Sequence, residues 1–308
     1  MNVLHLSLRQ LQIFSAIART GSTTAASKEI SLSQSATSAA LNELERLLSI
    51  HLFERVGKRL VLNENGRALL PRALSLLNDA SEIEHMSNGA SLQAQSLRIG
   101  ASTTIGNYVL PKILRQFLSS YLQQDDDSWS SKVLIGNTEK ICAAVASFEL
   151  DIGLVEGPCH EPNLIVTPWA QDELVVVAQG GKKKKNEAPQ KLSLETLQQQ
   201  LWLLRESGSG TRESTDQLLL PYLGSYKRSM EMGSSEAIRN AVEQGLGVSY
   251  LSRWVVNEAI KSGRLRYLNT PLPLCRRQSY IVIHRNRVQT MMLQNFLKEL
   301  SIERLVDE

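Results

Sequence analysis

Apolar side chains recur at helical spacing through the first fifty residues. The first series consists of Leu8, Leu11, Phe14 and Ile17, and it predicts a helix that ends at Gly21. A second short helix carries the pair Ala25 and Ala26, and after the turn "SLS" a third helix has apolar residues at 36, 40, 44 and 47. Two helices joined by so short a turn pack closely only where side chains are small. The pattern therefore predicts a helix-turn-helix, with a plain three-helix bundle as the alternative.

The pattern changes to alternation in "LFERVGKRLVLNENG", residues 52–66, which predicts a β-hairpin around Gly57. The hairpin places three basic side chains near its tip: Arg55, Lys58 and Arg59. A helix-turn-helix with such a wing docks on DNA with the third helix in the major groove and the wing at phosphates or in the minor groove. We expect base contacts from the polar face of the third helix, at Ser33, Gln34, Ser35, Ser38 and Asn42. Residues 1–64 are thus predicted to form a winged helix-turn-helix domain.

A long helical pattern follows, and we expect a linker helix over residues 65–87. Alanine alternates with leucine or isoleucine along it at intervals of four and three, at Leu69, Ala73, Leu76, Ala80 and Ile83. Such a seam allows two copies of the helix to pack against one another as a dimer. The alternative is that the same face lies on its own domain. Residues 88–96, "NGASLQAQS", lack apolar periodicity and are predicted to be a hinge.

From residue 97 the pattern is that of an α/β fold. Short apolar runs of strand type alternate with segments of helical length, which predicts strands joined by crossover helices. We expect lobe I to comprise residues 97–168 and 271–308 and lobe II residues 169–270, with crossovers near 167–169 and 269–273. The fold class of the whole chain is then α+β with several domains. A two-lobed domain like that of periplasmic binding proteins holds its ligand in a cleft, outside the carboxyl ends of its strands.

Small polar residues follow the expected strands where helices begin. The predicted ligand-binding residues are Ser102, Thr103, Thr104, Asn137, Thr138, Glu156, Gly210, Thr211, Ser234 and Ser235. Helix N-termini carry free N–H groups and a partial positive charge, so several of them aimed at one cleft suit a compact anion. The alternative for each motif alone is a helix cap. We predict a small anionic effector.

Composition and charge narrow the function classes. The 308 residues are 42% hydrophobic and 21% charged, as in ordinary globular proteins, and the net charge of +3 does not by itself indicate nucleic acid. No apolar run reaches the roughly 18 residues of a membrane span and no signal-peptide pattern opens the chain, so we expect a cytoplasmic protein without a membrane partner. Three widely spaced cysteines predict neither a disulfide framework nor a metal pair. Without a nucleophile elbow or a phosphate-binding loop, we expect no enzyme, no catalytic residue and no cofactor.

Residues 8–70, from "LRQLQIF" to "GRALL", resemble the N-terminal domain of the LysR-type transcriptional regulators. The stretches "ASTTIGNYVLPKIL", "DIGLVEGPCH", "LRESGSGTRE" and "GSSEAIRNAVEQGLGVSYLSR" are similar to the effector domain of that family, closest to its YeiE-like branch beside the CysB type. Many members carry basic residues where this chain has Ala39, Asn42 and Glu43, which weakens a carry-over of their base contacts.

The resemblance implies a DNA-binding regulator whose long helix dimerises. Its partners would be double-stranded DNA, further copies of itself as a homodimer or homotetramer, and RNA polymerase. The resemblance also implies a compact oxyanion as effector, such as sulfite, sulfate or a small sulfur-related acid. The alternative is a solute-binding or metabolite-sensing protein whose N-terminal domain serves only protein interaction.

Overall fold

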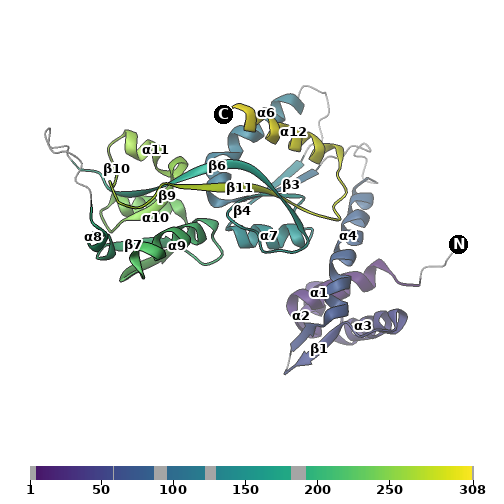
Figure 1. The fold of residues 1–308 in the computed structure, drawn as a ribbon. Coiled ribbons are helices and arrows are strands. Elements are labelled where there is room, and N and C mark those ends of the chain that lie inside the picture. The colour runs from purple at the N-terminus through teal and green to yellow at the C-terminus, as the bar shows by residue number, and fades with distance from the viewer. Residues whose placement is uncertain (1–4, 58, 87–95, 122–129, 182–191, 307–308) are drawn as a thin grey trace. The chain divides into compact units, whose positions relative to one another are not determined.

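The computed structural model describes residues 5–57, 59–86, 96–121, 130–181 and 192–306 (Figure 1). The chain divides into two compact units, Met1–Ala94 and Gln95–Glu308. Lys58 of the predicted wing lies outside the described residues, as does the predicted hinge apart from Ser96.

The N-terminal unit consists of a helix-turn-helix, a wing and a long helix. Its elements are α1 (Leu8–Thr20), α2 (Thr23–Glu29), α3 (Gln34–Leu48), β1 (Phe53–Val56), β2 (Arg59–Leu62) and α4 (Glu64–Met86). The hydroxyls of Ser7, Ser22 and Ser33 cap the first three helices by accepting a backbone N–H. The core of this unit includes Phe14 and Ala26, which are fully buried. β1 and β2 pair antiparallel, so the predicted winged helix-turn-helix is confirmed.

α4 does not present the predicted seam on one face. Ala73 is 1% exposed, and Leu69 and Leu77 pack with it against the core of the N-terminal unit. Leu76 and Ile83, by contrast, are 51% and 64% exposed. Three residues fall about 60° short of a full turn of the helix, so the side chain of Leu76 points in a different direction from that of Ala73. The part of the seam that is open to a second copy is therefore formed by Leu76 and Ile83.

The C-terminal unit contains a mixed sheet that runs through both lobes. In lobe I, β3 (Ser96–Ser102) lies between β4 (Ser130–Gly136) and β5 (Ile152–Glu156) and is parallel to both. Two long strands, β6 (Leu164–Gln179) and β11 (Cys275–His284), pair antiparallel and extend the sheet into lobe II. There β9 (Ser249–Ser252) and β10 (Leu265–Tyr267) pair with β6. A second sheet in lobe II has the parallel strands β7 (Leu201–Arg205) and β8 (Arg228–Met232).

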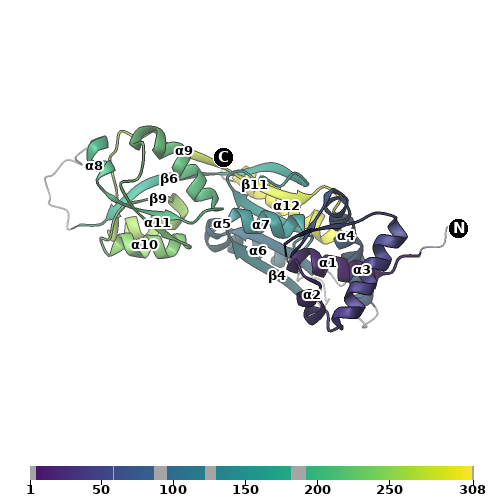
Figure 2. The same cartoon turned by 90° about the horizontal axis from the view of Figure 1, so that it is seen from below.

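Helices cover the sheets on both faces (Figures 1 and 2). In lobe I, α6 (Leu110–Tyr121) and α12 (Met291–Val306) lie on one face, where the rings of Phe117 and Phe296 are 5.1 Å apart, and α7 (Thr138–Ala146) lies on the other. Lobe II has α8 (Leu194–Gln198) and α9 (Gly210–Leu223) in one core cluster and α10 (Ser235–Glu243) and α11 (Arg253–Lys261) in another. The short α5 (Thr103–Tyr108) directly follows β3.

The second crossover between the lobes lies later than predicted. β6 runs without a break through 167–169, where the first crossover was expected. The second was expected near 269–273, but Cys275 still pairs with the lobe II part of β6 and packs against the lobe II core that contains Trp202. The register shifts between Gln278 and Tyr280, and beyond this point β11 pairs with the lobe I strands. The prolines of "NTPLPL" therefore mark a loop inside lobe II rather than the boundary between the lobes.

Candidate functional site

The exposed face of α3 and the wing border one hollow in the N-terminal unit. The hollow has a volume of about 570 Å³, and its lining includes Gln34, Ser38, Asn42, Arg55 and Arg59. Nε2 of Gln34 donates to the hydroxyls of Ser38 at 3.0 Å and Thr23 at 3.3 Å. Two further predicted contact residues, Ser33 and Ser35, hydrogen-bond to one another at the start of α3. Of the predicted DNA contacts, those in the described part of the chain thus lie along α3 and the wing.

The acidic residues of α3 are engaged in contacts within the unit. Both carboxylate oxygens of Glu43 accept hydrogen bonds from Arg46, at 2.6 and 2.7 Å. Glu45 accepts the backbone N–H of Leu52 at 2.7 Å and so ties the end of α3 to the start of the wing. Arg46 therefore neutralises the charge of Glu43, and Glu45 stabilises the turn that follows α3. The exposed face of α3 is left with neutral polar side chains.

A buried arginine lies between the two lobes of the C-terminal unit. Arg205 is the last residue of β7 and is 4% exposed. Its Nη1 donates to the hydroxyl of Ser235 in lobe II at 2.9 Å, and its Nη2 donates to the hydroxyl of Thr103 in lobe I at 3.4 Å. The carboxylate of Glu206 accepts from Nε and Nη2, and it also accepts from the side-chain amide of Asn137 at 3.3 Å. Three of the predicted ligand residues therefore surround one ion pair.

A second buried arginine, Arg277 of β11, contacts other residues of the predicted site. Its Nη1 donates to the hydroxyl of Thr211 at 2.7 Å, and its Nε and Nη2 donate to Asp172 at 2.9 and 2.6 Å. The same Nη2 lies 3.7 Å from Oε1 of Glu156. Asp172, Thr211 and Glu156 are all at most 5% exposed, so this network is closed to solvent.

Thr138 and Gly210 join the lobes at the starts of α7 and α9. The hydroxyl of Thr138 donates to the backbone oxygen of Glu156 at 2.8 Å and accepts the N–H of Gly210 at 3.3 Å. A Cβ atom at Gly210 would lie 1.8 Å from that same oxygen, so no side chain fits there. The polar groups of these predicted ligand residues thus form hydrogen bonds in the contact between the lobes.

Two hydroxyl groups at the start of α5 have no hydrogen-bond partner among the described residues. They belong to Ser102 and Thr104, each 1% exposed. Ser102 holds the N-cap position without capping its helix, whereas the side chains of Asn137 and Ser234 cap α7 and α10. Buried hydroxyls in proteins normally have hydrogen-bond partners, so a bound acceptor next to Thr103 would supply the partner that these two hydroxyls lack.

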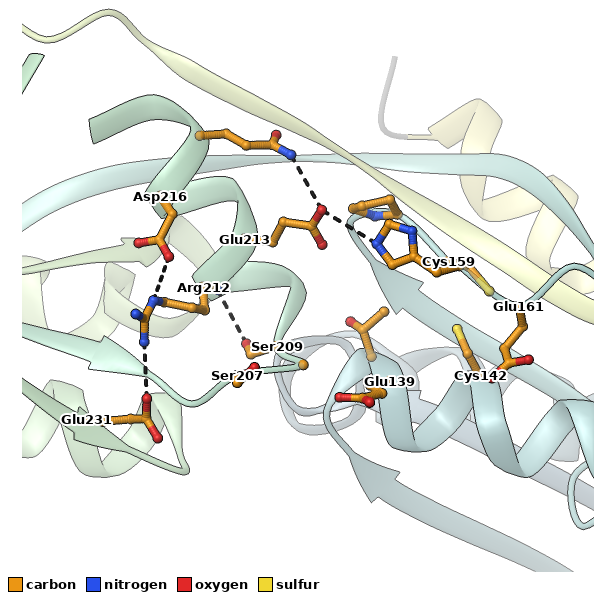
Figure 3. Close-up of a pocket in the computed structure, with 15 residues that line it drawn as sticks. Glu139, Cys142, Cys159, Glu161, Ser207, Ser209, Arg212, Glu213, Asp216 and Glu231 are labelled. Atoms are coloured by element: carbon orange, nitrogen blue, oxygen red, sulfur yellow. Dashed lines mark hydrogen bonds and ion pairs between the residues drawn. The ribbon is translucent and has the colours of Figure 1, made fainter. Parts of the chain in front are cut away.

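A separate pocket of about 560 Å³ lies between α7 and the start of α9 (Figure 3). Its charged lining is mostly acidic: Glu139, Glu161, Glu213, Asp216 and Glu231, with Arg212 held by the last two at 2.7 and 3.2 Å. Cys142 and Cys159 face one another at one side, and the hydrogen bond between them lowers the pKa of Cys159 to about 7. An acidic lining does not suit an anion. In the described part of the chain, no group of three His, Cys, Asp or Glu side chains is placed to hold a metal ion.

Two family models match the chain. The one described as bacterial regulatory helix-turn-helix protein, lysR family, matches residues 8–67, and the one described as LysR substrate binding domain matches residues 90–303. The chain belongs to the LysR family. It is a DNA-binding transcriptional regulator with an effector-binding domain. The alternative, a solute-binding or metabolite-sensing protein whose N-terminal domain serves only protein interaction, is therefore wrong.

Two of the proteins similar to this LysR regulator align over nearly its whole length, and a third aligns over about two thirds of it. It is 45% identical to the HTH-type transcriptional regulator YeiE of Escherichia coli strain K12, over 96% of this chain and 97% of YeiE. A full-length OxyR variant from Pseudomonas aeruginosa has a similar fold, with a TM-score of 0.64, 22% identity, and coverage of 97% of this chain and 95% of that chain. The CcmR regulatory domain of Synechocystis PCC6803 in complex with 2-PG aligns with a TM-score of 0.58 and 26% identity, over 68% of this chain and 97% of that chain.

Sequence reasoning missed both buried arginines of this LysR effector domain. Arg205 ends the apolar run "LWLLR", and Arg277 lies near the start of β11, directly before "QSYIVIH". A charged residue directly at the end of a buried strand was the available signal, because such a residue needs a partner once its strand is covered. Among the described helices, none has the length and apolar character that crossing a membrane requires.

Proposed function

We propose that this LysR regulator senses a small anionic effector held between the two lobes of its effector domain. Sulfite, sulfate or a small sulfur-related acid is the proposed class. The observation that carries the proposal is the guanidinium of Arg205, which is buried and contacts Thr103 of lobe I and Ser235 of lobe II. A buried positive charge that touches both lobes favours an anion over a neutral or cationic ligand.

Hydrogen-bond donors near Arg205 support a compact oxyanion. Such an ion offers only a few acceptor atoms, so its affinity comes from charge-assisted hydrogen bonds of roughly 1.5 to 3 kcal/mol each. The hydroxyls of Thr103 and Ser235 accept hydrogen bonds from Arg205, and that of Thr103 also donates to the backbone oxygen of Gly136 at 3.1 Å. The unpartnered hydroxyls of Ser102 and Thr104 flank Thr103 in the chain. We assign these side chains to the ligand, and we assign Thr138, Gly210, Thr211 and Glu156 to the contacts that shape the space between the lobes.

Binding at this place gives the effector a means of regulation. A ligand that joins Arg205 to Thr103 favours one relative arrangement of the lobes, by no more than its difference in affinity for the two arrangements. A homodimer or homotetramer passes that preference to the DNA-reading heads as a change in spacing or bending. The heads read bases with Gln34, Ser38 and Asn42 and hold phosphates with Arg55, Lys58 and Arg59.

We further propose that the protein acts in the cytoplasm as a regulator rather than an enzyme and that RNA polymerase is another partner. The complex of CcmR with 2-PG supports a small-molecule ligand in this fold. YeiE is a transcriptional regulator, in agreement with a regulatory role.

Calorimetric titration of the full-length protein with sulfite, sulfate and acetate tests the anion site. We expect saturable binding of at least one oxyanion. Thr103→Val keeps the shape of the side chain but removes the hydroxyl, and it should weaken that binding about tenfold. Absence of binding by all three anions, or equal binding by the parent and Thr103→Val, would contradict the proposal.

A further inference from the structure

Glu206 already holds the donors that an anion between the lobes would use. Its two carboxylate oxygens accept from Nε and Nη2 of Arg205, at 2.7 and 2.8 Å, which is the bidentate geometry of an arginine with a carboxylate. One of these oxygens also accepts from the amide of Asn137 in lobe I, at 3.3 Å. The pair therefore links a strand end of lobe II to the N-cap of α7.

The rest of the guanidinium is engaged by hydroxyl groups. Nη1 donates to Ser235 and Nη2 to Thr103, so the terminal edge of Arg205 faces one hydroxyl from each lobe. Arginine has five N–H donors in a fixed plane, and its side edge is the one that Glu206 covers. An oxyanion that binds Arg205 through two oxygens must therefore replace either these hydroxyls or Glu206.

Glu206 has better access to water than Arg205 and Ser235. Its side chain is 24% exposed, whereas that of Arg205 is 3% exposed and Ser235 is 1% exposed as a residue. Burial is the largest single effect on the pKa of Glu206 and raises it. The hydrogen bonds from Arg205, the backbone and Asn137, with the charge of Arg205, together lower this pKa below its usual value, so the carboxylate is charged at neutral pH. Glu206 can rotate into solvent and regain hydration there, while Arg205 cannot leave without an unpaired buried charge.

We infer that the carboxylate of Glu206 is an internal substitute for the effector, which an incoming oxyanion displaces from Arg205 and Asn137. This inference rests on the proposed anion site. One anion replaces another at a buried cation. A monoanion leaves the net charge between the lobes unchanged, and a dianion such as sulfate adds one negative charge. A neutral or cationic ligand cannot make this exchange, and Glu206 therefore selects the charge of the effector.

The inference also specifies the shape of the ligand. Two oxygens on a single atom, as in sulfite, sulfate or a carboxylate, match the spacing that Glu206 presents to Nε and Nη2. The resident carboxylate competes with that ligand in every molecule, so the apparent affinity is lower than the intrinsic affinity of the donors.

Removal of the charge at Glu206 tests the exchange. Glu206→Gln keeps the size of the side chain but removes its charge. Because the amide of the glutamine can still bind Arg205, Glu206→Ala is the second variant and removes the group altogether. Glu213→Gln is the matched control, because Glu213 lies in the first turn of α9 and contacts His160 and Gln217 rather than Arg205. Each full-length variant is titrated calorimetrically with sulfite, sulfate and acetate at constant ionic strength, and its melting temperature is measured with and without the anion.

We expect Glu206→Gln or Glu206→Ala to bind the oxyanion about tenfold more tightly than the parent, and Glu213→Gln to bind like the parent. Both Glu206 variants should melt lower than the parent without anion and gain more from its addition, since the anion then restores the partner of Arg205. Binding by the parent with equal or weaker binding by both Glu206 variants would overturn the inference and leave the proposed function intact. Absence of binding by the parent and all variants would overturn both.

Discussion

The hydroxyl of Thr211 accepts a hydrogen bond from Nη1 of Arg277 at 2.7 Å, although the sequence pattern placed Thr211 among the anion donors. Arg277 is 5% exposed and also binds Asp172 through its other nitrogens. Thr211 thus satisfies a buried guanidinium next to the crossover of β11. Thr211 is therefore the acceptor for Arg277, whereas Thr103 is an acceptor for Arg205, and the two residues have different roles.

Thr211→Val should lower stability more than anion affinity. The substitution leaves a buried N–H of Arg277 without its acceptor, and we expect the free energy of unfolding to fall by about 1 to 3 kcal/mol in chemical denaturation. Thr196→Val, at an exposed position at the start of α8, is the control and should be near neutral. If Thr211→Val instead kept its stability and lost as much anion affinity as Thr103→Val, Thr211 would be a ligand donor.

His284 should make the effector domain sensitive to acid. Its ring is 2% exposed, packs 4.1 Å from the ring of Phe148, and accepts the backbone N–H of Asn286 on Nδ1. Burial lowers the pKa of His284 below the ordinary 6.5, and the positive charge of Arg285 adds to this. The unfolded chain therefore takes up this proton at a pH where the folded chain does not. Stability is then lost as the pH falls below 6.5.

Denaturation of the parent and of His284→Gln over a range of pH checks this sign. The variant should lose less stability than the parent on acidification below 6.5. His160→Gln is the control, since the side chain of His160 is 78% exposed, and it should follow the parent curve. Identical slopes for His284→Gln and the parent would show that other groups cause the loss.

Gln34→Ala should weaken binding to the cognate DNA site much more than binding to random DNA. The amide of Gln34 lies at the hollow between α3 and the wing, and a lost base contact costs about 1 to 3 kcal/mol of discrimination. Arg55→Ala provides the contrast, because a lost phosphate contact should weaken binding to both DNAs alike and flatten the salt dependence. Fluorescence anisotropy at several salt concentrations measures both effects. A uniform loss for Gln34→Ala would leave it only a positioning role.

Leu76→Asp should lower the oligomeric mass without unfolding the protein. Leu76 is 51% exposed on α4, where a charge would oppose the packing of a second copy. Ala73→Asp should behave differently, because Ala73 is 1% exposed in the core of its own unit and a carboxylate there disrupts folding. Light scattering and circular dichroism distinguish the two outcomes. If Leu76→Asp keeps the parent mass, the dimer uses another surface.

Local patterns were sufficient to predict most of the fold. The helical spacing of Leu8 to Ile17, the hairpin around Gly57 and the strand type of "LRIG" depend on residues near one another in the chain, so the sequence displays them directly. The crossover at Gln278 was not predictable in this way, because the lobe to which a segment of β11 belongs is decided by its pairing with β6 and β5.

The candidate site was predictable only as a set of helix starts. Thr103 and Ser235 were found because hydroxyl residues mark the starts of helices, but their common partner Arg205 was not. These residues are far apart in sequence, and they meet only because Arg205, at the end of β7 in lobe II, also reaches Thr103 of lobe I. The same limit applies to α4, where the heptad pattern of Leu69 to Ile83 did not show which residues the domain core would bury.

The most direct test of the central claim is the affinity of the full-length protein for its cognate DNA as sulfite is added at constant ionic strength. We predict a saturable change of roughly 5- to 150-fold in the parent, with the midpoint shifted to higher sulfite in Thr103→Val. The same titration with sodium chloride in place of sulfite should give no saturable change. An unchanged DNA affinity in the parent, or identical curves for the parent and Thr103→Val, would contradict an anion-sensing site at Arg205.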